Sequence, residues 1–259
     1  MQLIDSHCHL TYEPMFSDLD NVIDECKKND ISHLLSISTN LETATKSIHI
    51  ANTYPNVYTT IGLHPCDVKD NFNDLDKIFS LLTTSKKIIA IGEIGLDFYR
   101  YKNNRSKQIE IFEKQINFAD KNNLPIVIHT RSANDDMFSI IESTLKKKNI
   151  KFLIHCFSEN SEFCKKLLNL GCYISFSGIV TFKNASEIKK SAILTPLDRI
   201  LVETDAPYLS PEPLRGKVNS PLNVKYVAKY ISKLKNVTLD KFSEQTSENF
   251  NNFFNINVK

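Results

Sequence analysis

Histidines and carboxylates gather near the carboxyl ends of short apolar segments along this chain. His7 and His9 follow Leu3 and Ile4 within the first such segment. On a β-strand alternate side chains share a face, so these two imidazoles would project from the same side. Two imidazoles held in this way can bind one metal ion, although a pair of surface histidines has the same spacing. The first segment therefore predicts half of a metal site, provided that later segments supply further ligands.

The later segments do carry such residues. His64, His129 and His155 stand at or near the ends of three segments, Glu93 lies in another, and Asp205 ends the last one. A buried cluster of imidazoles and carboxylates is costly unless a cation neutralises and coordinates it. Mixed nitrogen and oxygen ligands suit Zn²⁺, Mn²⁺, Fe²⁺ or Co²⁺, and a carboxylate-rich site also admits Mg²⁺. The sequence therefore predicts a divalent metal centre.

Six ligands are too many for one tetrahedral ion with an open position, so we predict two divalent cations bridged by one carboxylate. The expected ligands are His7, His9 and Asp205 on one ion, His129 and His155 on the other, and Glu93 shared between them. Paired ions ~3.5–4 Å apart activate water and hold both oxygens of an in-line phosphoryl displacement. The other two histidines, His33 and His49, do not end a segment, and we expect them to be structural or solvent-exposed.

Three side chains are candidates for catalysis. Asp205 is placed to accept the proton of a metal-activated water as general base, or it acts as a ligand only. His64 has no assigned metal and would hydrogen-bond the phosphate or the leaving oxygen, unless it is a structural residue before Pro65. Glu203 shares the alternation of Asp205, so we expect it to orient a metal-bound histidine.

Two arginines are candidates for substrate binding. Arg131 and Arg215 are possible phosphate clamps, because a guanidinium group matches a phosphate bidentately. For Arg131 a salt bridge within the fold is an equal alternative. Asp97, which follows Glu93 in the same segment, is expected to fix the loop after it rather than to contact substrate.

Two kinds of segment alternate along the chain and carry these residues. Short β-branched runs alternate with amphipathic segments whose apolar residues are three and four apart, which predicts alternating strands and helices. Such alternation implies right-handed crossovers and a parallel sheet, and eight units suggest a closed (β/α)₈ TIM barrel, an α/β fold with an outer ring of helices. The alternative, an open doubly wound sheet, would more often carry a glycine-rich loop after its first strand, and this chain has none there. The predicted strands are Leu3–His9, His33–Thr39, Val57–His64, Ile88–Asp97, Pro125–Arg131, Phe152–Ser158, Cys172–Gly178 and Ile200–Asp205.

After the last predicted strand, four prolines are expected to keep residues 206–221 extended and non-helical. Two helices, Leu222–Leu234 and Leu239–Phe254, should follow. The second is rich in phenylalanine, and we expect those rings to pack on the barrel rather than to stack on nucleic acid. No linker or repeat interrupts the pattern, so residues 1–259 are predicted to form a single domain.

Composition narrows the class of protein. In 259 residues, 41% are hydrophobic and 24% charged, with a net charge of +2. This near-neutral balance argues against non-specific nucleic-acid binding, so an acidic substrate must be attracted locally. The six cysteines form no C-x-x-C pair, there is no signal-like start, and no apolar run approaches the ~18 residues of a membrane span. We expect a cytoplasmic, reduced protein without membrane contact, and a monomer.

Taken together, the motifs resemble the TatD family of metal-dependent deoxyribonucleases across nearly the whole chain. The matching segments are Asp-Ser-His-Cys-His-Leu (5–10), Ile-Gly-Leu-His-Pro (61–65), Gly-Glu-Ile-Gly-Leu-Asp (92–97), Ile-His-Thr-Arg (128–131), His-Cys-Phe-Ser (155–158), Ser-Phe-Ser-Gly (175–178) and Glu-Thr-Asp-Ala-Pro-Tyr-Leu (203–209). The resemblance implies a TIM barrel, one or two divalent cations (Mg²⁺, Mn²⁺ or Zn²⁺), and hydrolysis of DNA phosphodiesters, usually from a 3′ end of a single strand. It also implies the same six metal ligands. Two residues depart from the family pattern, Glu159 in place of Gly and Ser220 in place of Glu, and these put loop shape and substrate choice in question.

Other functions remain open at this point. A barrel amidohydrolase acting on a cyclic amide or an aminoacyl ester would use the same metal-activated water, although several of those enzymes bridge their metals with a lysine where this chain has Glu93. A non-catalytic nucleic-acid-binding protein fits less well, because the ligand set is intact and the net charge is small. The sequence leaves RNA possible as a substrate.

Overall fold

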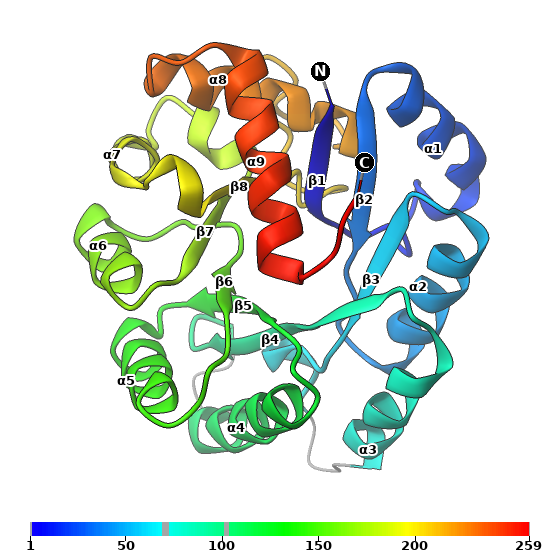
Figure 1. Cartoon of the computed structure of the whole chain (residues 1–259), viewed down its shortest axis with the longest axis vertical. Helices are drawn as coiled ribbons and strands as arrows, with labels where there is room; N and C mark the ends of the chain where they lie inside the picture. Colours follow the sequence, from blue (N-terminus) through cyan, green and yellow to red (C-terminus); the bar gives the residue numbers. More distant parts are fainter. Residues whose placement is uncertain (1, 69–72, 101–103, 259) are drawn as a thin grey trace.

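The computed structural model describes residues 2–68, 73–100 and 104–258, and in it eight parallel strands form a barrel surrounded by helices (Figure 1). Each strand pairs in parallel with the next one along the chain, from the first to the eighth. The predicted TIM barrel is therefore confirmed. The strands are β1 (Leu3–Cys8), β2 (Ile31–Ser36), β3 (Val57–Ile61), β4 (Ile88–Asp97), β5 (Ile126–Arg131), β6 (Phe152–Ile154), β7 (Tyr173–Phe176) and β8 (Ile200–Val202).

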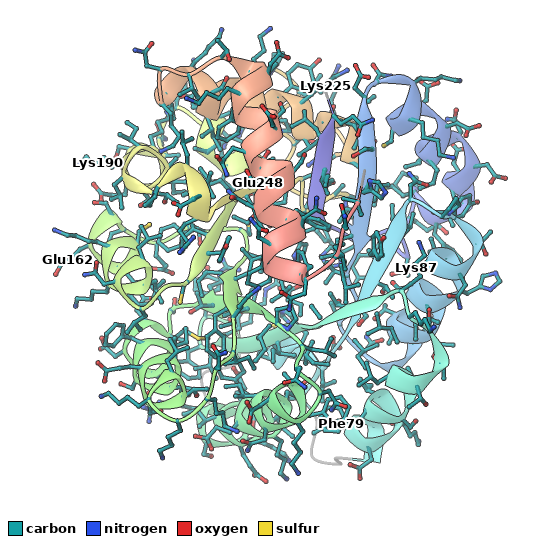
Figure 2. The ribbon with its side chains drawn as sticks, viewed as in Figure 1. Phe79, Lys87, Glu162, Lys190, Lys225 and Glu248 are labelled. Carbon is teal, nitrogen blue, oxygen red and sulfur yellow. The ribbon has the colours of Figure 1, made fainter. Side chains whose placement is uncertain are left out.

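Amphipathic helices cover the outside of the barrel. Their apolar residues face the strands: in α1, for example, Ile23 and Cys26 are buried. Their charged side chains extend outward, as Glu162 on α6 and Lys190 on α7 show (Figure 2). The helices are α1 (Leu19–Lys28), α2 (Leu41–Thr53), α3 (Asn73–Ser80), α4 (Arg105–Lys121), α5 (Asn134–Leu145), α6 (Ser161–Asn169), α7 (Ser186–Leu194), α8 (Val224–Leu234) and α9 (Leu239–Phe254).

The barrel closes where β1 meets the chain just after β8. The backbone N–H of Asp205 donates to the carbonyl of His7 at 2.9 Å, and the N–H of His9 donates to the carbonyl of Ala206 at 2.8 Å. Next to these bonds, the buried carboxylate of Asp5 accepts hydrogen bonds from both the backbone N–H and the hydroxyl of Thr204. The first and last strands are thus joined beside the residues that were predicted to bind metal.

The last helix, α9, closes the end of the barrel at which the strands begin. Phe250, Phe253 and Phe254 of α9 are buried against apolar residues such as Ile4 and Leu201, which lie near the start of their strands. Figure 1 shows α9 lying across the strands. The phenylalanines therefore pack on the barrel, as expected, and the opening at the carboxyl ends of the strands is left for function.

Most strands end earlier than predicted, because the residues that follow them no longer pair in the ladder; after β6 and β8 the backbone turns to positive φ at Cys156 and Asp205. His64, for example, lies beyond β3, and His155 follows β6 directly. Each still donates one backbone hydrogen bond to a neighbouring segment, His64 to Thr39 at 2.8 Å and His155 to Ile128 at 3.1 Å. These bonds fix the side chains without requiring a longer strand.

The segment after β8 contains turns but no helix until Pro221–Asn223, a short 3₁₀ helix that delays the start of α8 to Val224. The predicted start at Leu222 was therefore two residues early. Within residues 2–68, 73–100 and 104–258, no helix has the length and apolar character needed to cross a membrane.

Candidate metal centre

A cleft opens at the carboxyl ends of the strands, with a volume of about 660 Å³. It is lined by the three later histidines of the predicted site, His64, His129 and His155, together with His9, Glu93 and Asp205. A cleft of this size is in the ordinary range for small-ligand sites. The barrel thus brings residues from six strands, or from the segments directly after them, to one place.

Glu93 lies at the centre of this cluster, almost completely buried on β4. Its Oε1 is 2.7 Å from Nε2 of His155 and 2.9 Å from Nδ1 of His129. Its Oε2 faces the other way and is 3.5 Å from Nε2 of His7 and 4.0 Å from Nε2 of His9. The two oxygens of one carboxylate therefore face two different pairs of imidazoles.

Asp205 completes the group around Oε2. Its Oδ1 is 3.3 Å from Nε2 of His9 and 3.6 Å from Nε2 of His7. The residue has a φ of 57°, in the left-handed region that aspartate tolerates better than most side chains. This backbone turn directs the carboxylate into the cleft immediately after the closing bond to β1.

The donors fit a bound cation. Both ring nitrogens of His7 and Nδ1 of His9 are buried and have no hydrogen-bond partner among the described residues. Buried polar atoms without a partner are rare in folded proteins and call for an explanation such as an ion. Ligand atoms of His7, His9 and Asp205 lie within 4.8 Å of one another, as do those of His7, Glu93 and His155. A divalent cation would supply the missing partners.

Two carboxylates hold the histidines that face Oε1. Glu203 contacts Nδ1 of His155 at 3.3 Å, and Asp97 contacts Nε2 of His129 at 3.2 Å. In each ring the second nitrogen is thereby left to point at Glu93. Partners of this kind orient metal-binding imidazoles and fix the tautomer in which the free nitrogen can bind a cation.

The contact between Asp97 and His129 was missed by the sequence analysis. Asp97 does fix the following loop, since its Oδ1 accepts the backbone N–H groups of Tyr99 and Arg100. Its other oxygen faces the metal centre. The sequence does indicate that Asp97 faces the site, because residues two apart on a strand share a face, and Glu93, Gly95 and Asp97 follow this spacing on β4.

Gly95 is required for this arrangement. Its φ is 142°, and a Cβ at this position would lie 2.0 Å from the carbonyl oxygen of His129. Only glycine avoids that clash. It lets β4 approach β5 closely enough for Glu93 and Asp97 to reach the two nitrogens of the same imidazole.

The cluster favours charged carboxylates. Burial opposes the charge of Glu93, but His155, His64 and His129 around it hold its pKa well below the usual range. Burial likewise opposes the positive form of His155, yet Glu93 and Glu203 raise its pKa well above the ordinary value. Metal ligands must be deprotonated, and Glu93 meets that condition. Without metal, these negative charges favour a proton on the nitrogen of His155 that faces Glu93, and a bound cation would replace that proton.

His64 lies beside the same carboxylate, with Nε2 at 3.3 Å from Oε1 of Glu93. Its position, together with Glu93 and His129, also forms a group that could hold an ion. However, Nδ1 of His64 accepts the backbone N–H of Cys66 at 3.0 Å. In the neutral ring the proton is then assigned to Nε2, and a protonated nitrogen donates hydrogen bonds and does not bind metal.

The two arginines differ in their placement. Arg131 lines the cleft, and its guanidinium lies 4.0 Å from the ring centre of Tyr99. Among the described residues Arg131 has no ion pair with an acidic side chain, so the alternative of a salt bridge receives no support. Arg215 is exposed over the ring of Phe182 and does not line the cleft.

The two departures from the family pattern lie near the cleft. Glu159 accepts a hydrogen bond from the side chain of Asn134 at 2.9 Å, which ties the loop after β6 to the start of α5. Ser220 follows the buried Asn219, whose amide donates to the carbonyls of Thr204 and Tyr208. The segment that carries Asp205 is therefore fixed by Asn219, which remains in place beside the altered residue.

Comparisons with known proteins agree with this site. A family model described as TatD related DNase matches residues 4–255. The chain is 38% identical to the uncharacterized metal-dependent hydrolase YcfH of Escherichia coli K12, over 100% of this chain and 97% of that protein. It is 36% identical to YabD of Bacillus subtilis, also named an uncharacterized metal-dependent hydrolase, over 98% of this chain and 100% of that one.

The fold is that of a solved relative as well. The crystal structure of YJJV, a TatD homolog from Escherichia coli K12, matches with a TM-score of 0.92 over 98% of both chains at 24% identity. With the family model covering almost the whole chain, the relationship does not depend on one motif. The protein belongs to the TatD family of metal-dependent hydrolases.

Proposed function

We propose that this hydrolase is a deoxyribonuclease that uses two divalent cations to cleave single-stranded DNA from the 3′ end. The observation that carries the proposal is the position of Glu93, whose two oxygens face two separate sets of donors. A site for paired cations is the arrangement typical of phosphodiester hydrolysis. The name of the matching family supports DNA as the substrate, with RNA as the alternative nucleic acid.

In this proposal His7, His9 and Asp205 would hold one cation, His129 and His155 would hold the other, and Glu93 would be shared between them. The mixed donor set is compatible with Mg²⁺, Mn²⁺ or Zn²⁺. Bound there, the cations would neutralise phosphate charge and lower the pKa of a water molecule towards neutrality.

The protein's own side chains supply the remaining functions. The carboxylate of Asp205 is 14% exposed and opens to the cleft, so it can accept a proton from a water molecule as general base. His64 lines the cleft, and its Nε2–H, which lies 3.3 Å from Oε1 of Glu93, would donate a hydrogen bond to the phosphate or to the leaving oxygen once that carboxylate holds a cation. Glu203 is fully buried behind His155 and acts by positioning that ring.

Arg131 lines the cleft, and in this proposal it binds phosphate there. Its planar cation matches two phosphate oxygens and would compete well with water for them. Arg215 lies outside the cleft lining, so in this proposal it meets only the part of a strand that continues beyond the cleft. We further propose that residues 1–259 form one domain and that the protein is a monomer. We propose a cytoplasmic location as well, because all six cysteines are free, as expected in a reducing compartment.

The test is cleavage of a single-stranded oligonucleotide labelled at its 5′ end, by protein stripped of metal with EDTA and then supplied with Mg²⁺, Mn²⁺ or Zn²⁺. We expect no products in EDTA and, with metal, a ladder that shortens from the 3′ end. The rate on an RNA strand of the same sequence shows whether the enzyme prefers deoxyribose or ribose. The exposed variant Glu162→Gln serves as a control that should behave like the wild type.

Undiminished cleavage in EDTA would contradict the proposal, as would a protein that binds two cations and cleaves no nucleic acid. Immediate release of the labelled 5′ nucleotide would show the opposite polarity. Hydrolysis of a cyclic amide or an aminoacyl ester in place of DNA would instead support the amidohydrolase alternative.

A further inference from the structure

Tyr208 stands at the mouth of the cleft with 53% of its surface exposed. Its backbone N–H donates to the carbonyl of Asp205 at 2.9 Å, and its own carbonyl accepts the buried amide of Asn219 at 2.6 Å. A single exposed aromatic residue is ordinary on a protein surface. This one differs because its backbone is fixed on both sides and its ring lines the candidate active site.

Two aromatic rings, those of His9 and Tyr12, lie beside Tyr208. The ring of Tyr12 is parallel to that of His9, with centroids 5.0 Å apart, and its hydroxyl is 3.1 Å from the hydroxyl of Thr39. Tyr208 meets both of these rings edge to face, with centroids 6.3 Å away in each case. These contacts hold Tyr208 beside the metal centre while about half of its surface stays open.

Arg131 lines the same cleft as Tyr208. Tyr208 follows β8, whereas Arg131 ends β5, on the far side of the barrel from the junction of β1 and β8. The guanidinium of Arg131 rests on the ring of Tyr99, whose backbone N–H is bound by Asp97. The ring of Tyr99 therefore covers one face of the guanidinium of Arg131, a residue that lines the cleft.

We propose that Tyr208 stacks on the nucleobase next to the scissile phosphate, while Arg131, positioned by Tyr99, binds a neighbouring phosphate of the same strand. This inference rests on the proposed nuclease function and adds the groups that select the substrate. The ring of Tyr208 is 6.3 Å from that of His9, a distance that the sugar between a phosphate and its base can span. Stacking on a protein ring requires an unpaired base and tolerates any of the four, so the site selects single strands without selecting sequence.

The test compares the wild type with Tyr208→Ala, Tyr208→Phe and the control Tyr226→Ala, which lies on α8 and outside the cleft lining. The substrates are one complete single strand and two strands that each lack one of the two bases flanking the scissile phosphate. We expect Tyr208→Ala to raise KM by roughly 5- to 150-fold, the range that loss of one base–aromatic stack gives, with a smaller change in kcat. Tyr208→Phe should restore a KM close to that of the wild type, because the phenyl ring still stacks.

Removal of the base that stacks on Tyr208 should raise the KM of the wild type to the level of Tyr208→Ala. The same removal should leave the KM of Tyr208→Ala unchanged. A second readout needs no turnover: the fluorescence of 2-aminopurine at that position, measured in EDTA, should be quenched by the wild type and by Tyr208→Phe but less by Tyr208→Ala.

Three outcomes separate the possibilities. If the wild type cleaves DNA and Tyr208→Ala has the same KM on every strand, the stacking proposal is wrong and the nuclease function stands. If Tyr208→Ala loses the same factor on complete and base-free strands, Tyr208 has a structural role, which also overturns the proposal. If the wild type neither binds nor cleaves any strand, the proposed function itself fails.

Discussion

The carboxylate of Glu203 lies 3.3 Å from Nδ1 of His155, and the other nitrogen of that ring lies 2.7 Å from Glu93. Glu203 also accepts the backbone N–H of Cys156 at 2.8 Å, which fixes its Oε1 in place. A fully buried carboxylate with these partners has no access to the cleft. Its contribution must be made through the orientation and proton position of His155.

We predict that Glu203→Gln weakens metal binding by about 10- to 100-fold, the usual effect of removing a partner of a metal-binding histidine. The amide keeps the shape of the side chain but loses the charge that holds the proton on Nδ1 of His155. Titration calorimetry of the metal-free protein measures the change, and circular dichroism checks the fold. Glu162→Gln, exposed on α6, is the matched control. Unchanged affinity in Glu203→Gln would show that His155 does not need this partner.

A second prediction concerns His64. His64→Ala should retain both cations but lose most of its turnover, because the bond from the backbone of Cys66 leaves a proton on Nε2 and makes the ring a donor. The measurements are metal content by elemental analysis and kcat on single-stranded DNA. His49→Ala, an exposed histidine on α2, is the control. A loss of one metal equivalent in parallel with activity would instead make His64 a ligand, as its place beside Glu93 and His129 allows.

A third prediction tests the junction of the first and last strands. The hydroxyl of Thr204 donates to the buried carboxylate of Asp5. Thr204→Val keeps the volume but leaves that oxygen without its partner, which costs about 1–3 kcal/mol. For a chain of this size, each kcal/mol lowers the Tm by ~2–4 °C.

The melting temperature should be measured in EDTA, so that a change in metal affinity does not contribute. Thr45→Val, at an exposed position on α2, should have a Tm close to that of the wild type. An unchanged Tm in Thr204→Val would mean that the remaining backbone bonds hold β1 against β8 without help from Asp5.

The order and type of the elements could be predicted because parallel strands buried on both faces leave a continuous apolar signal. The strand ends could not, since His64 and His155 leave the ladder without any change in local composition. Single hydrogen bonds to Thr39 and Ile128 replace the ladder there. Such bonds depend on the neighbouring strand and are not visible in a local window of sequence.

The residues of the site were easier to predict than the contacts between them. Strand-end histidines and carboxylates in an eight-unit pattern indicated one cluster, and the structure brings them together. The pairing of Asp97 with His129 depends on the close approach of β4 and β5 at Gly95, which is a tertiary relationship. Arg215 lies outside the cleft lining because of the path of a proline-rich loop. No periodic pattern in the sequence predicts that path.

Metal stoichiometry in Glu93→Gln tests whether Glu93 joins the two proposed cations. The substitution keeps the shape of the side chain but removes the charge that offsets two neighbouring dications and leaves one of its two oxygens. Titration calorimetry and elemental analysis should be done beside His129→Ala, with circular dichroism to confirm that both variants fold. We predict that Glu93→Gln loses more bound metal than His129→Ala, which should weaken mainly the cation near Oε1. If Glu93→Gln still binds two ions with the affinity of the wild type, Glu93 does not bridge them and the proposed metal centre is wrong.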